Sequence, residues 1–286
     1  RIPSAVGYQP TLATDYREGI LVRSQNCTSE VGDECVFCGG SEDKASVLAF
    51  AELDTKTNSF KPIDGSSVVF GPFDGSDSWG TEDPRMQFNK EDGLYYMFYT
   101  AYNGQDIDLS LATTKNPIDT NTNEGWTRHG PVFPDQGLDT SKSGALLLRT
   151  NVYHQYLSTN YLLWGDSSIR ITSSDDLLHW DSLGDVLLAP RVDSFDSRLV
   201  EAGPPPLLLS SGDYLFFYNS AMEGFPDPGT SYNVGYAILS GKDPSKVLKR
   251  SDTPLLSPDY AYEQGVDPYP CNVPNVVFLE AAKPIG

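Results

Sequence analysis

A short unit of β structure repeats along the chain, and this repeat limits the fold more than any other feature. Each copy has an apolar or aromatic strand, a polar turn, a second alternating strand and then a Trp or Phe segment that leads to Gly-Pro or Pro-Val. In the four copies the two strands and the segment after them lie at 19–23, 46–50 and 60–62; 94–100, 109–113 and 126–127; 160–164, 169–173 and 179–180; and 214–218, 234–239 and 247–250. A fifth copy begins at 273–278. Small sheets that cannot bury both faces alone predict the blades of a propeller.

The sequence therefore predicts an all-β fold, a five-bladed β-propeller that occupies residues 1–286 as a single domain. Pro and Gly interrupt the chain at short intervals, and the apolar period is near two, so strong helix signals are absent. The fifth copy stops soon after one strand. We expect the last blade to be incomplete or to be closed by the N-terminal segment.

The charge of the chain argues against two classes of partner. The formal net charge is -19 and the sequence pI is about 4.3, with acidic residues spread in ones and twos. Nucleic acid and anionic membranes are poor partners for such a surface. No apolar run is long enough to cross a bilayer. The 16 Tyr residues suit sugar binding, although most aromatic residues in a β protein simply fill strands.

The cysteines predict a secreted protein. They are Cys27, Cys35, Cys38 and Cys271. One glycosylation sequon, Asn26-Cys27-Thr28, overlaps the first of them. We expect disulfide bonds and an extracellular glycoprotein, and the lack of a basic-plus-apolar leader is what a processed chain would show. The alternative is a zinc site at Cys35-Val36-Phe37-Cys38, but a second closely spaced pair is missing.

Several motifs lie in a fixed order along the repeats. They are Gly80-Thr81-Glu82-Asp83-Pro84-Arg85, Glu201-Ala202-Gly203-Pro204-Pro205-Pro206, Tyr232-Asn233-Val234-Gly235-Tyr236-Ala237, Asp243-Pro244-Ser245-Lys246-Val247 and Val273-Pro274-Asn275-Val276-Val277-Phe278. Each alone is ordinary turn chemistry, but together they resemble glycoside hydrolase family 130, whose members cleave β-mannosidic bonds. The similarity begins near Val68, and the cysteine-bearing loop after Arg23 has no counterpart in it.

The resemblance implies that Asp83 is the proton donor, in phosphorolytic members through a sugar hydroxyl. Glu201 precedes a rigid Gly-Pro-Pro-Pro turn and is a candidate base or sugar ligand, and Glu263 is a weaker candidate for the base. An inverting enzyme needs two such carboxylates. The predicted substrate-binding residues are Glu82, Arg85, Tyr102, Lys142, Arg170, Asp196, Tyr218, Asn219 and Tyr232. No sequence motif calls for a metal or a cofactor.

Three functions remain open at this point. The phosphorylases of the family carry Tyr-His-Gly where this chain has Tyr218-Asn219-Ser220, and a secreted enzyme gains little from phosphorolysis, so hydrolysis of mannose-containing oligosaccharides is favoured. The first alternative is a phosphorylase that uses inorganic phosphate as co-substrate, with the cations Arg85, Lys142 and Arg170, and makes mannose 1-phosphate. The second is an extracellular carbohydrate-binding propeller without activity. The linkage, β-1,2 or β-1,4, and the oligomeric state are not predicted.

Overall fold

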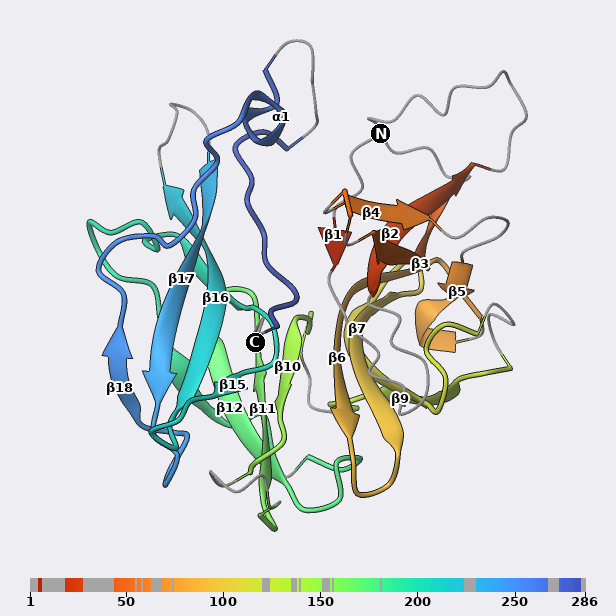
Figure 1. Cartoon of the computed structure of the whole chain (residues 1–286), viewed down its shortest axis with the longest axis horizontal. Coiled ribbons are helices and arrows are strands. Elements are labelled where there is room, and N and C mark those ends of the chain that lie inside the picture. Colours follow the sequence, from red (N-terminus) through yellow and green to blue (C-terminus); the bar gives the residue numbers. More distant parts are fainter. Residues whose placement is uncertain are drawn as a thin grey trace.

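The described part of the chain is built from antiparallel β-sheets, which confirms the all-β prediction (Figure 1). The computed structural model describes residues 5–6, 19–27, 44–54, 56–57, 59–62, 68–73, 75–119, 124–134, 138, 140–150, 155, 157–180, 182–223, 230–266 and 273–283. In these ranges the helical elements are the 3-10 turn η1 (Gly75–Asp77) and the one-turn helix α1 (Ala261–Gln264). Neither of these described elements has the length needed to span a membrane.

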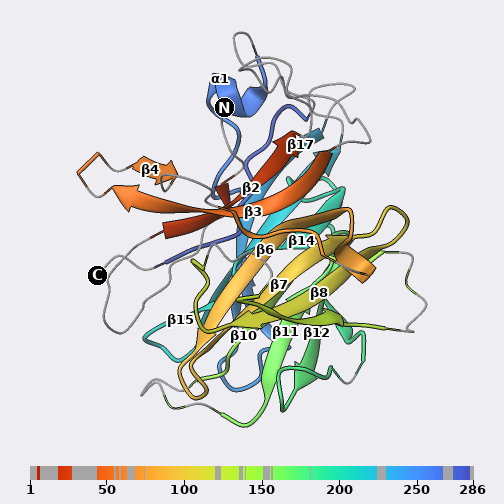
Figure 2. The ribbon, with the colours of Figure 1, turned by 90° about the vertical axis from the view of Figure 1, so that its right-hand side faces the viewer.

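The N-terminal half forms one sheet. Its strands are β1 (Ala5–Val6), β2 (Gly19–Cys27), β3 (Lys44–Asp54), β4 (Ser59–Pro62), β5 (Val68–Phe70), β6 (Gly80–Asn89), β7 (Leu94–Tyr102), β8 (Ile107–Thr114) and β9 (Thr127–Pro131). The order is β1-β2-β3-β6-β7-β8-β9, with β4 and β5 both paired to β3. Only the parallel pair Ser46 and Gly80 joins β3 to β6, so the first two predicted copies are nearly separate antiparallel units. Figure 2 shows β6, β7 and β8 running side by side.

The third and fourth copies each form their own sheet. One contains β10 (Gly144–Leu147), β11 (Asn160–Trp164), β12 (Ile169–Ser174) and β13 (Asp185–Leu188). The other contains β14 (Leu199–Ala202), β15 (Leu207–Leu208), β16 (Tyr214–Glu223), β17 (Thr230–Leu239) and β18 (Val247–Arg250). Residues 179–180, the aromatic segment of the third copy, lie outside the strands: Trp180 is buried against Phe98 at a ring distance of 5.8 Å, and β13 begins at Asp185.

Stacking of the sheets explains the sequence of β7, which is buried on both faces. Tyr95, Met97 and Tyr99 enter one apolar cluster, while Tyr96 and Phe98 enter the next. Successive side chains of a strand point to opposite faces, so each face of this strand packs against a different layer. A third cluster joins the β10–β13 sheet to the β14–β18 sheet. This packing brings the first strands of successive sheets toward a common centre.

The last predicted copy is not a regular strand in the described residues. Its segment 273–280 makes one parallel bridge, between Val276 and Tyr232 of β17. The side chain of Asn219 then holds Leu279 at both backbone atoms: its amide nitrogen donates to the Leu279 carbonyl at 2.9 Å, and its oxygen accepts the Leu279 N–H at 2.7 Å. In Figure 1 this segment runs down between the β14–β18 sheet and β6. None of the sheets closes on itself within the described residues.

The predictions about cysteine chemistry concern side chains that lie outside the described part of the chain. Cys35, Cys38 and Cys271 are not among the described residues, and only the backbone of Cys27 is described, in β2. The disulfide, zinc and glycosylation alternatives therefore stay predictions.

Candidate active site

Asp83 lies at an irregularity inside β6, where the backbone is held in an unusual conformation. The first strand of this copy was predicted at 94–100, so β6 was missed: it begins at Gly80, and its pairing with β7 shifts between Glu82 and Arg85. Pro84 has no N–H to give to the ladder, which favours a bulge at this point. Asp83 takes a φ of 49°, a left-handed value that is uncommon for residues other than glycine. Such backbone often marks a functional position.

Glu201, in β14, is a buried carboxylate with two polar neighbours. Its side chain is almost fully enclosed, at 3% exposure. The Ser143 hydroxyl donates a hydrogen bond to Glu201 Oε1, and Lys142 Nζ lies 3.6 Å from the same oxygen. Ser143, directly before β10, also has a left-handed φ, of 60°. The start of β10 is therefore shaped to present two consecutive side chains to Glu201.

Lys142 is the cation at the centre of this group. Besides Glu201, its ammonium lies 3.9 Å from Asp166 Oδ2, in the turn between β11 and β12. Burial alone would lower the pKa of Lys142, but the negative charges of Glu201, Asp83 and Asp166 raise it above its ordinary value. Lys142 thus pairs with Glu201 and Asp166, and Asp83 lies within electrostatic reach of it. Asp166 and Ser143 were not predicted, because neither lies in a motif that marks it.

Burial also raises the pKa of the Glu201 carboxyl. The positive charges of Lys142 and Arg85 and the Ser143 hydrogen bond oppose this rise, while the charge of Asp83 adds to it. A carboxylate that binds a proton more readily than usual is a stronger base at neutral pH. The structure therefore places Asp83 within electrostatic reach of a carboxylate whose environment suits a general base.

Arg85 is buried next to Asp83, and its guanidinium is hydrogen-bonded to backbone carbonyls. Its exposure is 1%. The guanidinium donates to the carbonyl of Asp83 at 2.8 Å, to that of Ala202 at 2.9 Å and to that of Gly203 at 3.3 Å. It also lies 3.4 Å from Glu280 Oε1. Its described contacts are therefore with the protein itself.

Asp196 and Tyr218 belong to a second buried cluster. The Asp196 carboxylate accepts hydrogen bonds from Arg191, Arg250 and the Tyr218 hydroxyl, and both Asp196 and Tyr218 have 0% exposure. Asn219, the next residue, is also fully buried and holds Leu279. These three residues, predicted to bind substrate, form hydrogen bonds with other parts of the protein.

Two further candidates have local partners. Glu263 accepts the backbone N–H groups of Asp259 and Tyr260 at 2.8 and 3.0 Å, which caps α1. Arg170 donates to the Gly184 carbonyl at 2.9 Å, within its own sheet. The structure does not bring either side chain into the group around Lys142.

The remaining candidates lie on strands that lead to the site. Glu82 accepts a hydrogen bond of 2.6 Å from Ser46. The rings of Tyr102 and Trp79 meet edge to face at 6.2 Å, and the Trp79 side chain is 53% exposed. Tyr232 contacts Phe278 of the C-terminal segment, with ring centres also 6.2 Å apart. Of these, Trp79 offers the largest open aromatic surface, and it was not predicted.

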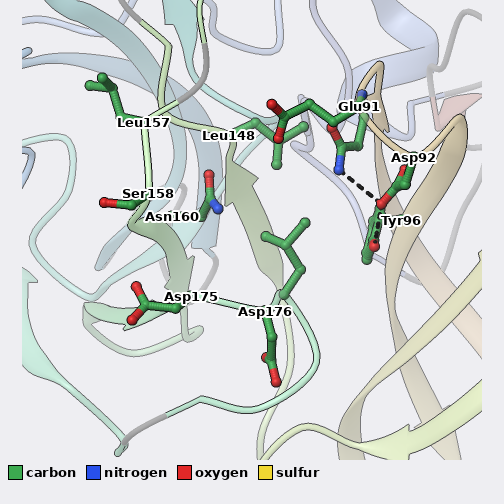
Figure 3. A pocket seen from close by; sticks show the side chains of 11 residues that line it. Glu91, Asp92, Tyr96, Leu148, Leu157, Ser158, Asn160, Asp175 and Asp176 are labelled. Carbon is green, nitrogen blue, oxygen red and sulfur yellow. Dashed lines mark hydrogen bonds between the residues drawn. The ribbon is translucent and has the colours of Figure 1, made fainter.

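A separate cavity of about 560 Å³ opens at the opposite end of β6 and β10. Figure 3 shows Glu91, Asp92, Asp175 and Asp176 around it. Asp92 accepts a hydrogen bond from the Tyr96 hydroxyl at 2.8 Å. None of the predicted site residues lines this cavity, and its carboxylates disfavour an anion. Across the described residues, no three His, Cys, Asp or Glu side chains are grouped so that they could hold a metal ion.

Curated proteins similar to this chain are bacterial mannoside phosphorylases. A 1,2-β-oligomannan phosphorylase of Thermoanaerobacter sp. (strain X514) is 33% identical over 204 residues, which cover 70% of this chain and 59% of that protein. A β-1,2-mannobiose phosphorylase of Listeria innocua is 29% identical over 198 residues, which cover 68% of this chain and 50% of that protein. The chain thus spans only half to three fifths of the length of these relatives.

Solved structures give the same assignment. One comes from work showing that the GH130 family of mannoside phosphorylases contains glycoside hydrolases that target β-1,2 mannosidic linkages in Candida mannan. It superposes with a TM-score of 0.73 and 27% identity, and the match covers 97% of this chain and 76% of the other. The β-1,2-mannobiose complex of the Listeria innocua phosphorylase has a TM-score of 0.62 and 26% identity, and the match covers 78% of this chain and 57% of the phosphorylase. A family model described as β-1,4-mannooligosaccharide phosphorylase matches residues 37–283, and the chain therefore belongs to glycoside hydrolase family 130.

Proposed function

We propose that the chain cleaves β-1,2-mannosidic bonds of mannooligosaccharides, with Asp83 as the proton donor and Glu201 as the base. The observation that carries this proposal is that Asp83, on a left-handed bulge, is held next to the segment of the buried Glu201, because the Arg85 guanidinium bonds the carbonyls of both Asp83 and Ala202. The names of two similar phosphorylases and of the structural work on Candida mannan support the β-1,2 linkage. The family model's description names β-1,4 linkages, which makes them the alternative to test.

The reaction balances with these two side chains. Asp83 gives its proton to the glycosidic oxygen, either directly or through a sugar hydroxyl, as the bond to the anomeric carbon breaks. A water molecule on the other face of the sugar attacks that carbon and loses a proton to Glu201. The products are free mannose with inverted configuration and the shortened oligosaccharide, and the two carboxyl groups exchange their protonation states.

The second candidate is phosphorolysis, which the names of the curated relatives favour. An incoming phosphate needs cationic donors. Here Lys142 lies among the carboxylates Asp83, Glu201 and Asp166. Arg85 is buried next to Glu280, and Asn219 is held by Leu279. This excess of negative charge is the observation that leads us to propose water as the acceptor.

Two further predictions, about the fold and about secretion, remain proposals. We propose that residues 1–286 form one five-bladed propeller, supported by the repeated antiparallel sheets and by the segment 273–280 that bridges to β17. We also propose that the protein is secreted, on the strength of the cysteine pattern and the sequon alone.

Product analysis tests the function. The chain would be incubated with β-1,2- and β-1,4-mannobiose, with and without inorganic phosphate, beside Asp83→Asn and the control Asp252→Asn, whose wild-type side chain is 98% exposed. Asparagine tolerates left-handed backbone, so Asp83→Asn removes the proton donor without new strain. Phosphate-independent mannose that disappears only in Asp83→Asn supports hydrolysis. Mannose 1-phosphate that requires phosphate establishes the second candidate, and sugar binding without any product favours a non-catalytic module.

A further inference from the structure

One buried side chain connects the segments that carry both proposed catalytic carboxylates. The Arg85 guanidinium holds the carbonyl of Asp83 itself, and it holds the carbonyl of Ala202, the residue after Glu201. It also binds the carbonyl of Gly203, which begins the turn after β14. A guanidinium presents five N–H donors in a rigid plane, so it can fix several acceptors in one geometry. The relative position of β6 and β14 at the site thus depends on Arg85.

The charge of Arg85 is balanced from the C-terminal segment. Glu280 Oε1 lies 3.4 Å from the guanidinium, and the side chains are 4% and 0% exposed. A buried guanidinium needs such a counter-charge, because removal of one member of a buried ion pair is strongly destabilising. Glu280 is thus the charged contact through which the segment reaches β6 and β14.

The C-terminal segment is itself held at several points. Asn219 binds Leu279 at both backbone atoms, next to Glu280. Earlier in the segment, the Val276 N–H donates to the Glu263 carbonyl at 2.9 Å, and the Tyr232 N–H donates to the Asn275 carbonyl at 2.8 Å. These bonds deliver Glu280 to Arg85 in a defined position.

We propose that Arg85 is a positioning residue that sets the spacing of Asp83 and Glu201, and that docking of residues 273–280 through Glu280 holds Arg85 in place. The inference rests on the roles proposed above for the two carboxylates. It predicts that a change at Arg85 or Glu280 acts on turnover more than on sugar binding, because both side chains are buried. Misplacement of a reacting group by about 1 Å costs about 100-fold in rate.

The test compares three variants of the full chain. Arg85→Lys keeps the charge but loses the planar fork, Glu280→Gln keeps the shape but loses the charge, and Arg250→Lys is the matched control. Arg250 is also a mostly buried arginine, but it binds Asp196 and the Ala189 carbonyl. We expect kcat for mannobiose cleavage to fall about 100-fold in Arg85→Lys, with KM within about threefold. Arg250→Lys should melt at a lower temperature and keep the wild-type kcat.

The pH profile gives a readout that simple loosening of the fold would not give. The positive charge of Arg85 lowers the pKa of Glu201. Glu280→Gln removes a negative charge that offsets Arg85, so the acidic limb of kcat/KM should move to lower pH. A limb that stays in place, or a loss of kcat in Arg250→Lys equal to that in Arg85→Lys, overturns the proposal.

Amide hydrogen exchange separates this proposal from the function itself. Exchange at Leu279 should rise at least about tenfold in Arg85→Lys and Glu280→Gln and stay at the wild-type rate in Arg250→Lys. If the wild-type chain turns over no mannoside, the proposed function fails, and the exchange experiment still decides whether Arg85 and Glu280 lock the segment. Unchanged exchange in both variants overturns the lock whatever the activity.

Discussion

Replacement of Asp196 by asparagine tests whether this residue stabilises the fold or binds sugar. Its carboxylate, with 0% exposure, accepts hydrogen bonds of 2.9 Å from Arg191 Nη2, 2.6 Å from Arg250 Nη2 and 2.9 Å from the Tyr218 hydroxyl. Asparagine removes the counter-charge of two guanidinium groups and turns an amide N–H₂ toward them. Arg191 and Arg250 keep exposures of 30% and 14%, so water reaches them only in part.

The expected cost follows from this burial. Loss of one partner from a buried ion pair destabilises a protein by about 3–5 kcal/mol, and the partial exposure of Arg191 argues for the lower end, about 3 kcal/mol. For a domain of this size that corresponds to a fall in Tm of about 6–10 °C. Asp252→Asn is the matched control, because Asp252 also approaches Arg191, at 4.0 Å, but is 98% exposed. It should change stability by less than about 0.5 kcal/mol.

The pH dependence has a definite sign. Burial alone would raise the pKa of Asp196, but the hydrogen bonds from Arg191 and Tyr218 and the charge of Arg250 lower it below its ordinary value. The stabilisation is therefore present above the unfolded pKa, about 3.9, and is lost as pH falls through the lower folded value. Thermal melts at neutral pH and near pH 3 should show the gap between wild type and Asp196→Asn shrinking in acid. Equal melting of Asp196→Asn and wild type at neutral pH, together with lost sugar binding, would refute a structural role.

Further predictions concern three other residues. Because burial raises the pKa of Glu201, the folded state favours the neutral carboxyl more than the unfolded chain does. The stability that the neutral carboxyl contributes is present below about pH 4 and is lost as pH rises through the folded pKa. Glu201→Gln should therefore abolish turnover yet raise Tm at neutral pH and not in acid, and a lower Tm at neutral pH would contradict this. Asn219→Ala removes two hydrogen bonds to Leu279 and should cost about 2 kcal/mol in urea unfolding, whereas an unchanged midpoint would show that the segment is held elsewhere. Glu263→Ala removes the cap of α1 and should cost about 1 kcal/mol while kcat stays within about twofold; a large loss of kcat would restore Glu263 as a base.

Strands whose sequence alternates or is continuously apolar could be predicted from the sequence. This applies to β7, whose aromatic run is buried on both faces, and to β16, where Tyr214, Phe216 and Tyr218 are buried at alternate positions. The strand β6 was missed because Pro84 and its charged neighbours look like a turn, and only the bulge reconciles them with a sheet. The repeat pattern marks Trp180 as the end of a copy, but the pattern does not show that its ring packs in the core beside Phe98.

The site could be predicted only as far as motifs reached. Asp83 and Glu201 lie in recognisable segments, and the structure brings them within electrostatic reach. Asp166 joins them through the fold alone, from a turn with no special sequence. The sequence also does not show which charged side chains are buried. Arg85 was predicted to bind substrate, and its burial depends on contacts with Gly203 and Glu280, which are far away along the chain.

The position of Glu280 beside Arg85 has a consequence for the order of folding. On a chain made from the N-terminus, β6, β10 and β14 are complete before residues 273–280 exist, so the first sheets must assemble while the Arg85 guanidinium still lacks this carboxylate. Contacts between segments so far apart in sequence close large loops and form slowly. A folding intermediate with its sheets in place and its last segment undocked would expose the edge of β17 that Val276 covers. Such an intermediate would be the species most open to proteolysis and edge-to-edge association.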